Sequence, residues 1–150
     1  MADRISTNRR SQNMAAIKGK NTSIEQYICH ELFRKGYRYR KNVSYIPGHP
    51  DLYLKKYNTA IFVNGCFWHR HENCRYAYNP KTREEFWEKK FNTNIERDAK
   101  VKQMLIEKGI KCIIVWECTV KKMKKDAEYK DMILDEIELF MSTDNLFMEL

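Results

Sequence analysis

The feature that most constrains the fold of this 150-residue chain is a set of cysteine and histidine residues in two distant segments. Cys66, His71 and Cys74 lie in one short polar segment, and Cys118 lies far along the chain. These residue types are the usual ligands of a tetrahedral Zn²⁺ site, with Zn–S distances near ~2.3 Å. A closed site of three sulfurs and one nitrogen is structural. It would fix the 66–74 segment to the end of the strand expected before Cys118.

The choice of these ligands has alternatives. His69 stands in the same segment and could replace His71, and Cys112 could replace Cys118. Another interpretation is that the cysteines are small buried apolar residues. It suits Cys112, which lies inside an apolar run, and Cys29, which lies on an expected helix. It does not suit the polar segment, where the cysteines stand among Arg, His, Glu and Asn.

The apolar patterns predict one α/β domain over residues 22–150, with helices around a central mixed sheet. Thr22 and Glu25 form a capping-box pattern before a helical stripe, and Gly36 fits the end of that helix. Strands are then expected over 37–43, 51–55 and 59–63, the last two as a hairpin.

In the second half, Ile110–Trp116 is a near-continuous apolar run, typical of a strand buried on both faces. Two helices are expected before it. One begins at Thr82 and the other covers about 95–108, with a break near Asn92-Thr93-Asn94. Apolar residues at helical spacing mark a C-terminal amphipathic helix: Ile133, Leu134, Ile137, Phe140 and Met141.

The net charge is +8, from 28 basic and 20 acidic residues, and such an excess favours a polyanionic partner. Residues 1–21 are polar and basic and are predicted to form an N-terminal arm. No apolar run approaches the ~20 residues of a membrane span, and the N-terminus lacks the apolar stretch of a secretory signal. We therefore expect a cytoplasmic or nucleoid-associated protein of bacterial type, where cysteines favour metal binding or burial over disulfides.

Two side chains are candidates for chemistry. Asp51 opens an expected strand after a Gly-His-Pro turn, where it is either a turn cap or a ligand of a hard cation such as Mg²⁺. His69, once His71 is given to Zn²⁺, is either a proton shuttle on a rigid segment or a structural hydrogen-bonding residue. The capping box accounts fully for Glu25, so a catalytic role for it must be argued from outside that helix.

Large aromatic side chains accompany the polar segment. Phe67 and Trp68 directly follow its first cysteine, and Trp87 lies on the next expected helix. Aromatic residues usually belong to the core. On a rigid basic loop, however, they can wedge between stacked bases and bend the DNA.

Six short motifs occur in order and resemble one family. They are Lys18-Gly-Lys-Asn-Thr-Ser-x-Glu25, Pro47-Gly-x-Pro-Asp51, Gly65-Cys-Phe-Trp-His69, Glu85-Phe-Trp87, Asn94-x-Glu-Arg-Asp98 and Val115-Trp-Glu-Cys118. Together, over about residues 8–120, they look like the very-short-patch (Vsr) DNA mismatch endonucleases, a branch of the restriction-endonuclease-like fold. Gly-Cys-Phe-Trp-His followed by Trp-Glu-Cys is highly specific.

The resemblance implies a nickase that recognises a T·G mismatch in double-stranded DNA, left by deamination of 5-methylcytosine, and cuts one strand beside the thymine. It implies a catalytic set of Asp51, Glu25 and His69, with Mg²⁺ held by Asp51 and the backbone carbonyl of Val63. It implies Zn²⁺ on Cys66, His71, Cys74 and Cys118, and DNA contacts from Phe67, Trp68, Trp87 and Lys90. We expect a monomer, with mismatch-repair proteins as candidates for a protein partner.

The chain departs from the family pattern in three places. Asn64 stands where some members have a histidine, which removes one proton carrier. Two residues separate His71 from Cys74 where another branch is shorter by one, so the choice between His69 and His71 stays open. The acidic-x-Lys half of the broader nuclease motif is absent after the hairpin, so Asp51 would be the only direct carboxylate ligand.

Two other functions fit the same residues. One is a strand-nicking component of a restriction–modification system that acts on matched DNA. The other is a zinc-containing DNA-binding module without catalysis.

Overall fold

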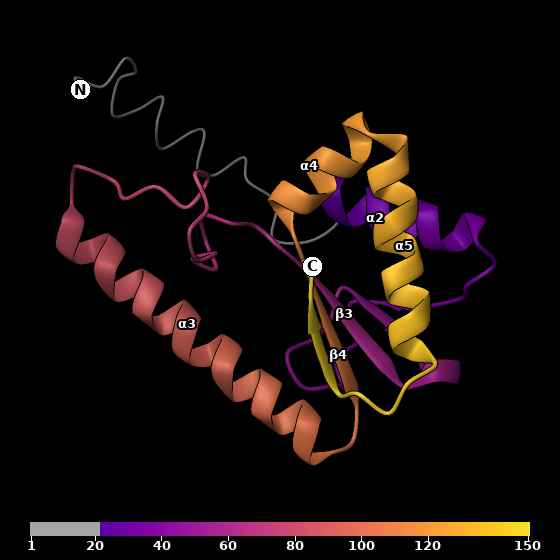
Figure 1. The fold of residues 1–150 in the computed structure, drawn as a ribbon. Coiled ribbons are helices and arrows are strands. Elements are labelled where there is room, and N and C mark those ends of the chain that lie inside the picture. The colour runs from indigo at the N-terminus through magenta and orange to yellow at the C-terminus, as the bar shows by residue number, and fades with distance from the viewer. Residues whose placement is uncertain (1–21) are drawn as a thin grey trace.

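The computed structural model describes residues 22–150, and the predicted basic arm at 1–21 lies outside them (Figure 1). Its centre is a five-stranded sheet in the order β1-β2-β3-β4-β5. The strands are β1 Arg40–Lys41, β2 Leu52–Leu54, β3 Thr59–Asn64, β4 Lys111–Trp116 and β5 Phe147–Glu149. The first three strands pair antiparallel, and β3, β4 and β5 pair parallel. The predicted mixed sheet is therefore confirmed.

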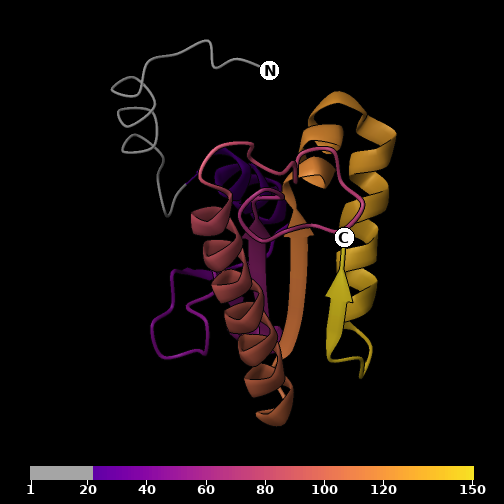
Figure 2. The same cartoon turned by 90° about the vertical axis from the view of Figure 1, so that its left-hand side faces the viewer.

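Helices cover both faces of this sheet (Figures 1 and 2). On one face lie α2 (Ser23–Arg34), α4 (Glu117–Lys125) and α5 (Ala127–Met141), and on the other lies α3 (Glu84–Glu107). Side chains alternate between the two faces along a strand. Ile113 of β4 therefore packs into the core formed with α2, α4 and α5. Its neighbour Cys112 packs into the core on the α3 side, with Leu105. The prediction of a strand buried on both faces is thus confirmed.

The predicted first helix and hairpin also form. Thr22 is the N-cap of α2, where its hydroxyl oxygen accepts a bond from the Glu25 backbone N–H at 3.4 Å. Gly36 follows the helix with φ +96°, a backbone conformation that glycine adopts without steric cost. A 3₁₀ turn, Lys55–Tyr57, joins β2 to β3, and Asn58 completes it in the left-handed region.

Some sequence predictions were wrong or incomplete. The expected break near Asn92-Thr93-Asn94 does not occur, because α3 is continuous from Glu84 to Glu107. The Thr93 hydroxyl donates to the Lys89 carbonyl inside the helix, and the Asn94 amide reaches outside it, so neither side chain ends the helix. The strand expected over 37–43 is only two residues long. The separate helix α4 and the strand β5 were not predicted.

The sheet determines where the site lies. Because β3 and β4 are parallel and Asn64 pairs with Trp116, their carboxyl ends meet at one edge. The Cys/His segment follows β3 at that edge, and α4, which contains Cys118, follows β4. Among residues 22–150, no helix is long and apolar enough to span a membrane. The restriction-endonuclease-like classification stays a prediction.

Candidate active site and metal-binding cluster

The predicted metal ligands come together at this edge of the sheet. One ligand atom from each of four residues lies within 4.8 Å of the others: Cys66, His71, Cys74 and Cys118. The Nδ1 atom of His71 lies 3.6 Å from the Cys66 sulfur and 3.4 Å from the Cys118 sulfur. These separations suit neighbouring ligands of a tetrahedral ion with metal–ligand bonds of about 2.0–2.3 Å. The donor set therefore fits a structural Zn²⁺ ion.

The surroundings of the cluster fix its geometry. The His71 ring stacks on Trp116 with centroids 4.2 Å apart and planes 7° from parallel. The Cys66 backbone N–H donates to Glu117 at 3.3 Å, and the Cys118 backbone N–H points at the Cys66 sulfur at 3.4 Å. Burial raises the pKa of the Cys66 thiol to about 12, so a bound cation is needed to favour its thiolate near neutral pH.

The two histidines of the segment lie in different places. His71 faces the thiols, whereas His69 makes a contact of 2.6 Å from its Nδ1 atom to a carboxylate oxygen of Asp98 on α3. Cys112 lies within β4, opposite Ala60. The geometry therefore groups His71 and Cys118 with the other two cysteines, and it groups neither His69 nor Cys112 with them.

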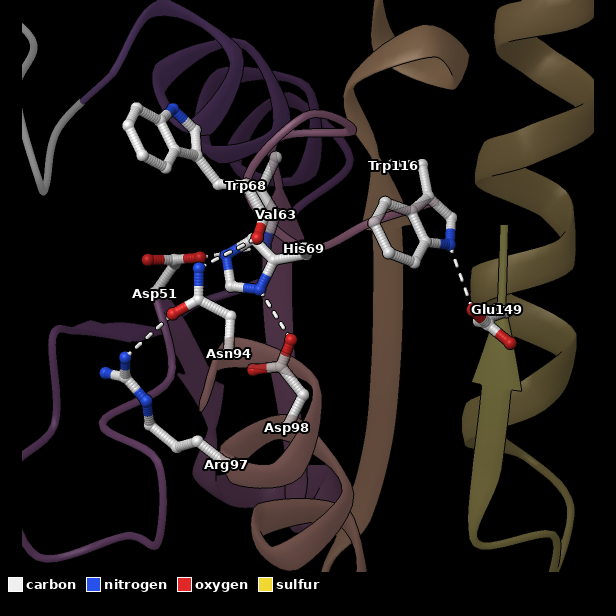
Figure 3. A network of polar contacts seen from close by, with 9 residues as sticks. All are labelled: Asp51, Val63, Trp68, His69, Asn94, Arg97, Asp98, Trp116 and Glu149. Carbon is white, nitrogen blue, oxygen red and sulfur yellow. Dashed lines mark hydrogen bonds and ion pairs between the residues drawn. The ribbon is translucent and has the colours of Figure 1, made fainter. Parts of the chain in front are cut away.

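Asp51 lies next to the end of β3. Its carboxylate accepts a hydrogen bond of 2.7 Å from the Val63 backbone N–H (Figure 3). Burial raises the pKa of this carboxyl from 3.8 to about 7, although the Val63 hydrogen bond lowers it. The nearby charge of Glu25 raises the pKa further, and that of His69 lowers it. Glu25 and His69 therefore both lie close enough to Asp51 to affect its ionisation.

The turn before Asp51 explains why this carboxylate sits where it does. Gly48 has φ +82°, and a Cβ atom there would lie 2.4 Å from a Val101 methyl group and 3.0 Å from the Phe62 ring. Only glycine lets the turn approach the α3 face this closely. His49 follows with a left-handed backbone conformation, and Pro50, which is buried, directly precedes Asp51.

The N-terminus of α2 brings Glu25 to the same place. Glu25 is only 5% exposed, although it lies in the first turn of its helix. A capping box alone does not require a buried glutamate, because such caps usually face solvent. Its burial and its charge effect on Asp51 are what the sequence pattern could not reveal.

Two residues on α3 that contact the candidate site were not recognised from the sequence, although both lie in a quoted motif. Asp98 contacts His69, and Asn94, only 7% exposed, donates to the Trp68 carbonyl oxygen at 2.9 Å (Figure 3). Arg97 donates to the Asn94 side chain at 3.1 Å. Asn94 and Asp98 are four residues apart on one face of a continuous helix. Because a helix break was expected near Asn94, the sequence did not indicate that these two side chains lie on the same face of one helix.

The predicted DNA-contacting aromatics also gather in one cluster. The Phe67 ring lies 5.2 Å from Trp68 and 5.5 Å from Trp87, and the two tryptophans lie 5.7 Å apart. All three are half-buried, and the buried ring of Phe91 packs against Phe67 and Trp87. Lys90 is exposed on the same helix.

A cavity of about 360 Å³ lies beside this cluster, and Trp68 and His69 both line it. Its polar lining includes His69, Asn64 and Asp98, and Lys90 and Arg97 bring positive charge. A negatively charged ligand in it would lie beside the His69 imidazole and the Trp68 ring.

The fold and the site together define an α/β protein in which a histidine–carboxylate contact, His69 with Asp98, lies close to a Cys/His cluster that could bind a metal. The family model of the DNA mismatch endonuclease Vsr matches residues 2–75. The DNA mismatch endonuclease Vsr of Escherichia coli strain K12 is 39% identical over 125 residues, which cover 83% of this chain and 80% of that protein. The chain belongs to the Vsr family of DNA mismatch endonucleases.

Other relatives are called nicking enzymes. The type II nicking enzyme V.NmeAIP of Neisseria meningitidis serogroup A is 39% identical over 138 residues, which cover 92% of this chain and 98% of that protein. The type II nicking enzyme V.XorIIP of Xanthomonas oryzae is 36% identical over 118 residues, or 79% of this chain and 86% of that protein. Family membership therefore implies a DNA-directed nuclease, and the finer specificity is a separate question.

Proposed function

We propose that this protein nicks one strand of double-stranded DNA beside the thymine of a T·G mismatch, by Mg²⁺-dependent phosphodiester hydrolysis, in very short patch repair. The observation that carries this proposal is the buried carboxyl of Asp51, whose pKa is affected by the nearby charges of both Glu25 and His69. A phosphate in this corner would be near both the carboxylates and a proton-transferring group.

The donor set suits Mg²⁺. Asp51 and the Val63 backbone carbonyl would hold the ion, and the Glu25 carboxylate would bind its water shell. Oxygen ligands with several retained waters are what this cation prefers. The buried Asp51 carboxyl is difficult to ionise in the protein alone, which is expected of a residue whose partner is a cation. Bound there, Mg²⁺ would supply charge stabilisation for the attacking and leaving oxygens.

His69 would move the proton. Its Nδ1 atom faces Asp98, so the ring has its Nε2 atom left for water or for the leaving oxygen (Figure 3). A carboxylate on one ring nitrogen fixes the tautomer and orientation of an imidazole that acts as acid or base with the other. Asp98 would therefore be a positioning residue for His69.

The Cys/His cluster would have a structural role. Cys66, His71, Cys74 and Cys118 would bind Zn²⁺ as a closed site, which leaves no open position for substrate. The ion would join the segment after β3 to the start of α4. It would therefore hold His69 and the two aromatics between the ligands in fixed positions.

The aromatic cluster would read the mismatch. Phe67, Trp68 and Trp87 would enter the stack beside the mispaired thymine, and Lys90 would contact the backbone. Unstacking costs a few kcal/mol per step and is lowest at a mismatched base. This difference would direct the enzyme to a T·G pair.

A second candidate function is strand nicking of matched DNA within a restriction–modification system. Its support is the description of several relatives as type II nicking enzymes. The same active-site chemistry would serve it, so only the substrate distinguishes the two candidates.

A nicking assay separates these functions. End-labelled duplexes of one sequence, with T·G, T·A and C·G at the central pair, are incubated with and without Mg²⁺. We expect one nick beside the thymine of the T·G duplex, only with Mg²⁺. Equal nicking of the C·G duplex would favour the restriction-type function, and Mg²⁺-independent binding without a nick would favour the non-catalytic module.

Asp51→Ala tests the site in the same assay. We expect loss of nicking while most DNA affinity remains. Full cleavage by this variant with Mg²⁺ would refute the proposed role of Asp51.

A further inference from the structure

The segment between the Cys/His cluster and α3 contains an exposed aromatic ring that no assigned role uses. Tyr78 is 64% exposed, although its ring lies 4.9 Å from that of Phe67 at an angle of 39°. Exposing a large ring beside half-buried aromatics is costly in water, because apolar surface stays hydrated. Tyr78 thus extends the aromatic cluster towards solvent.

Arg70 holds this segment in place. Its Nη1 atom donates to the carbonyl oxygens of Phe67, at 3.2 Å, and of Tyr78, at 3.1 Å. Its Nη2 atom donates to the Ala77 carbonyl at 3.0 Å and to the Asn79 side-chain oxygen at 2.7 Å. One guanidinium therefore joins the Cys/His segment to residues 77–79.

The same guanidinium is also fixed against α3. Its Cζ atom lies 4.0 Å from the centre of the Phe91 ring, a cation–π contact with a buried side chain. Arg70 itself has φ +53°, an uncommon backbone conformation for a non-glycine residue. Four hydrogen bonds and a ring contact from one side chain are more than an exposed loop needs merely to stay folded, which points to a segment held for contact with a partner.

We propose that Tyr78 is a further DNA-contacting aromatic residue, and that Arg70 is the positioning residue that holds it beside Phe67. This inference rests on the proposed function, since its ligand is the mismatched duplex. Tyr78 would stack on an exposed base or sugar face, next to the bases that Phe67, Trp68 and Trp87 separate. Stacking of this kind requires a ring that is already ordered and already exposed.

The test uses the full-length protein and a fluorescently labelled T·G duplex, with Kd measured by anisotropy in buffer without Mg²⁺. Tyr78→Ala should raise Kd about ten-fold, as expected for the loss of one base–aromatic stack. Tyr78→Phe should behave as wild type. Phe33→Ala is the matched control, because it removes a ring that is 53% exposed and carries a cation–π contact with Arg38, at the far end of α2 from Glu25.

Arg70→Lys keeps the charge but cannot reach four oxygens, because an ammonium group lacks the planar fork of a guanidinium. It should raise Kd by a similar factor. If Arg70 acts through Tyr78, the double variant Arg70→Lys/Tyr78→Ala should bind within about two-fold of the weaker single variant. Zinc content and Tm of every variant show whether the fold is intact.

The outcomes are distinct. An unchanged Kd for Tyr78→Ala would overturn the role of Tyr78 in DNA binding. If the increases in Kd of the two single variants multiply in the double variant, Arg70 does not act through Tyr78, and that part of the inference is overturned. Wild-type protein that binds the duplex but nicks none would instead refute the proposed function, and the Kd series would still report on Tyr78. Nicking by wild type together with a Tyr78→Ala variant that matches Phe33→Ala would refute this inference alone.

Discussion

The buried carboxyl of Asp51 predicts that one substitution will abolish activity and stabilise the protein. Its pKa rises from 3.8 to about 7 in the folded state, mainly through burial. A carboxyl with a raised pKa binds its proton more tightly in the folded state than in the unfolded state. Between pH 4 and 7 it therefore reduces stability as the pH increases, and above pH 7 the full penalty is present.

The magnitude follows from the same two pKa values. At about 1.36 kcal/mol for each pKa unit, the rise from 3.8 to about 7 corresponds to a penalty of about 4 kcal/mol at pH 8 as an upper limit. Asp51→Asn removes the charge and keeps an oxygen that can accept the Val63 N–H. In buffer without added divalent cation, this variant should melt up to about 12 °C above wild type at pH 8, since about 3 °C accompanies each kcal/mol for a chain of this size.

The assay is thermal unfolding of both proteins from pH 5.5 to 8.5. The difference in Tm should grow with pH, and added Mg²⁺ should reduce it by stabilising wild type alone. Asp144→Asn, which changes an exposed carboxylate after α5, serves as the control and should show no such trend. A variant less stable than wild type at pH 8, or a pH-independent difference, would refute the reasoning.

Three further predictions concern the other parts of the site. Asp98→Asn should lower the single-turnover nicking rate about 10²- to 10⁴-fold and leave Kd for DNA nearly unchanged, because only the orientation of His69 is lost; an unaffected rate would contradict that role. His71→Ala should lose zinc, measured by atomic absorption, whereas His69→Ala should retain it; the opposite result would reverse the assignment of the two histidines. Gly48→Ala should lower the free energy of unfolding by about 1–3 kcal/mol in urea titrations, because its Cβ would meet Val101 at 2.4 Å in a left-handed backbone; unchanged stability would show that the turn can shift.

The sequence predicted the elements with strong local signals. Thr22 with its capping pattern, the hairpin and the apolar run Ile110–Trp116 all form as expected. The failures lie where local preference and tertiary contact disagree. Asn92-Thr93-Asn94 has a weak intrinsic preference for helix, yet the helix continues because Asn94 is buried and finds its partner on Trp68.

The candidate site shows the same division. Residue types and spacing were enough to suggest the metal ligands, because cysteines among polar and charged residues are not expected to be apolar core residues. The contact between His69 and Asp98 could not be predicted, because it depends on how α3 crosses the sheet. The strand β5 was missed for a similar reason: it is three residues long and depends on pairing with β4.

The backbone between the two histidines explains how one short segment can serve both sites. His69 and His71 differ by two positions, which in an extended chain would place both imidazoles on the same side. Arg70 between them has φ +53°, so the backbone is not extended there. As a result the His71 ring stacks on Trp116 beside the thiols, whereas the His69 ring faces Asp98 on α3. The hydrogen bonds of the Arg70 side chain stabilise this uncommon backbone conformation, so the residue that orders the aromatic segment also keeps the two imidazoles apart.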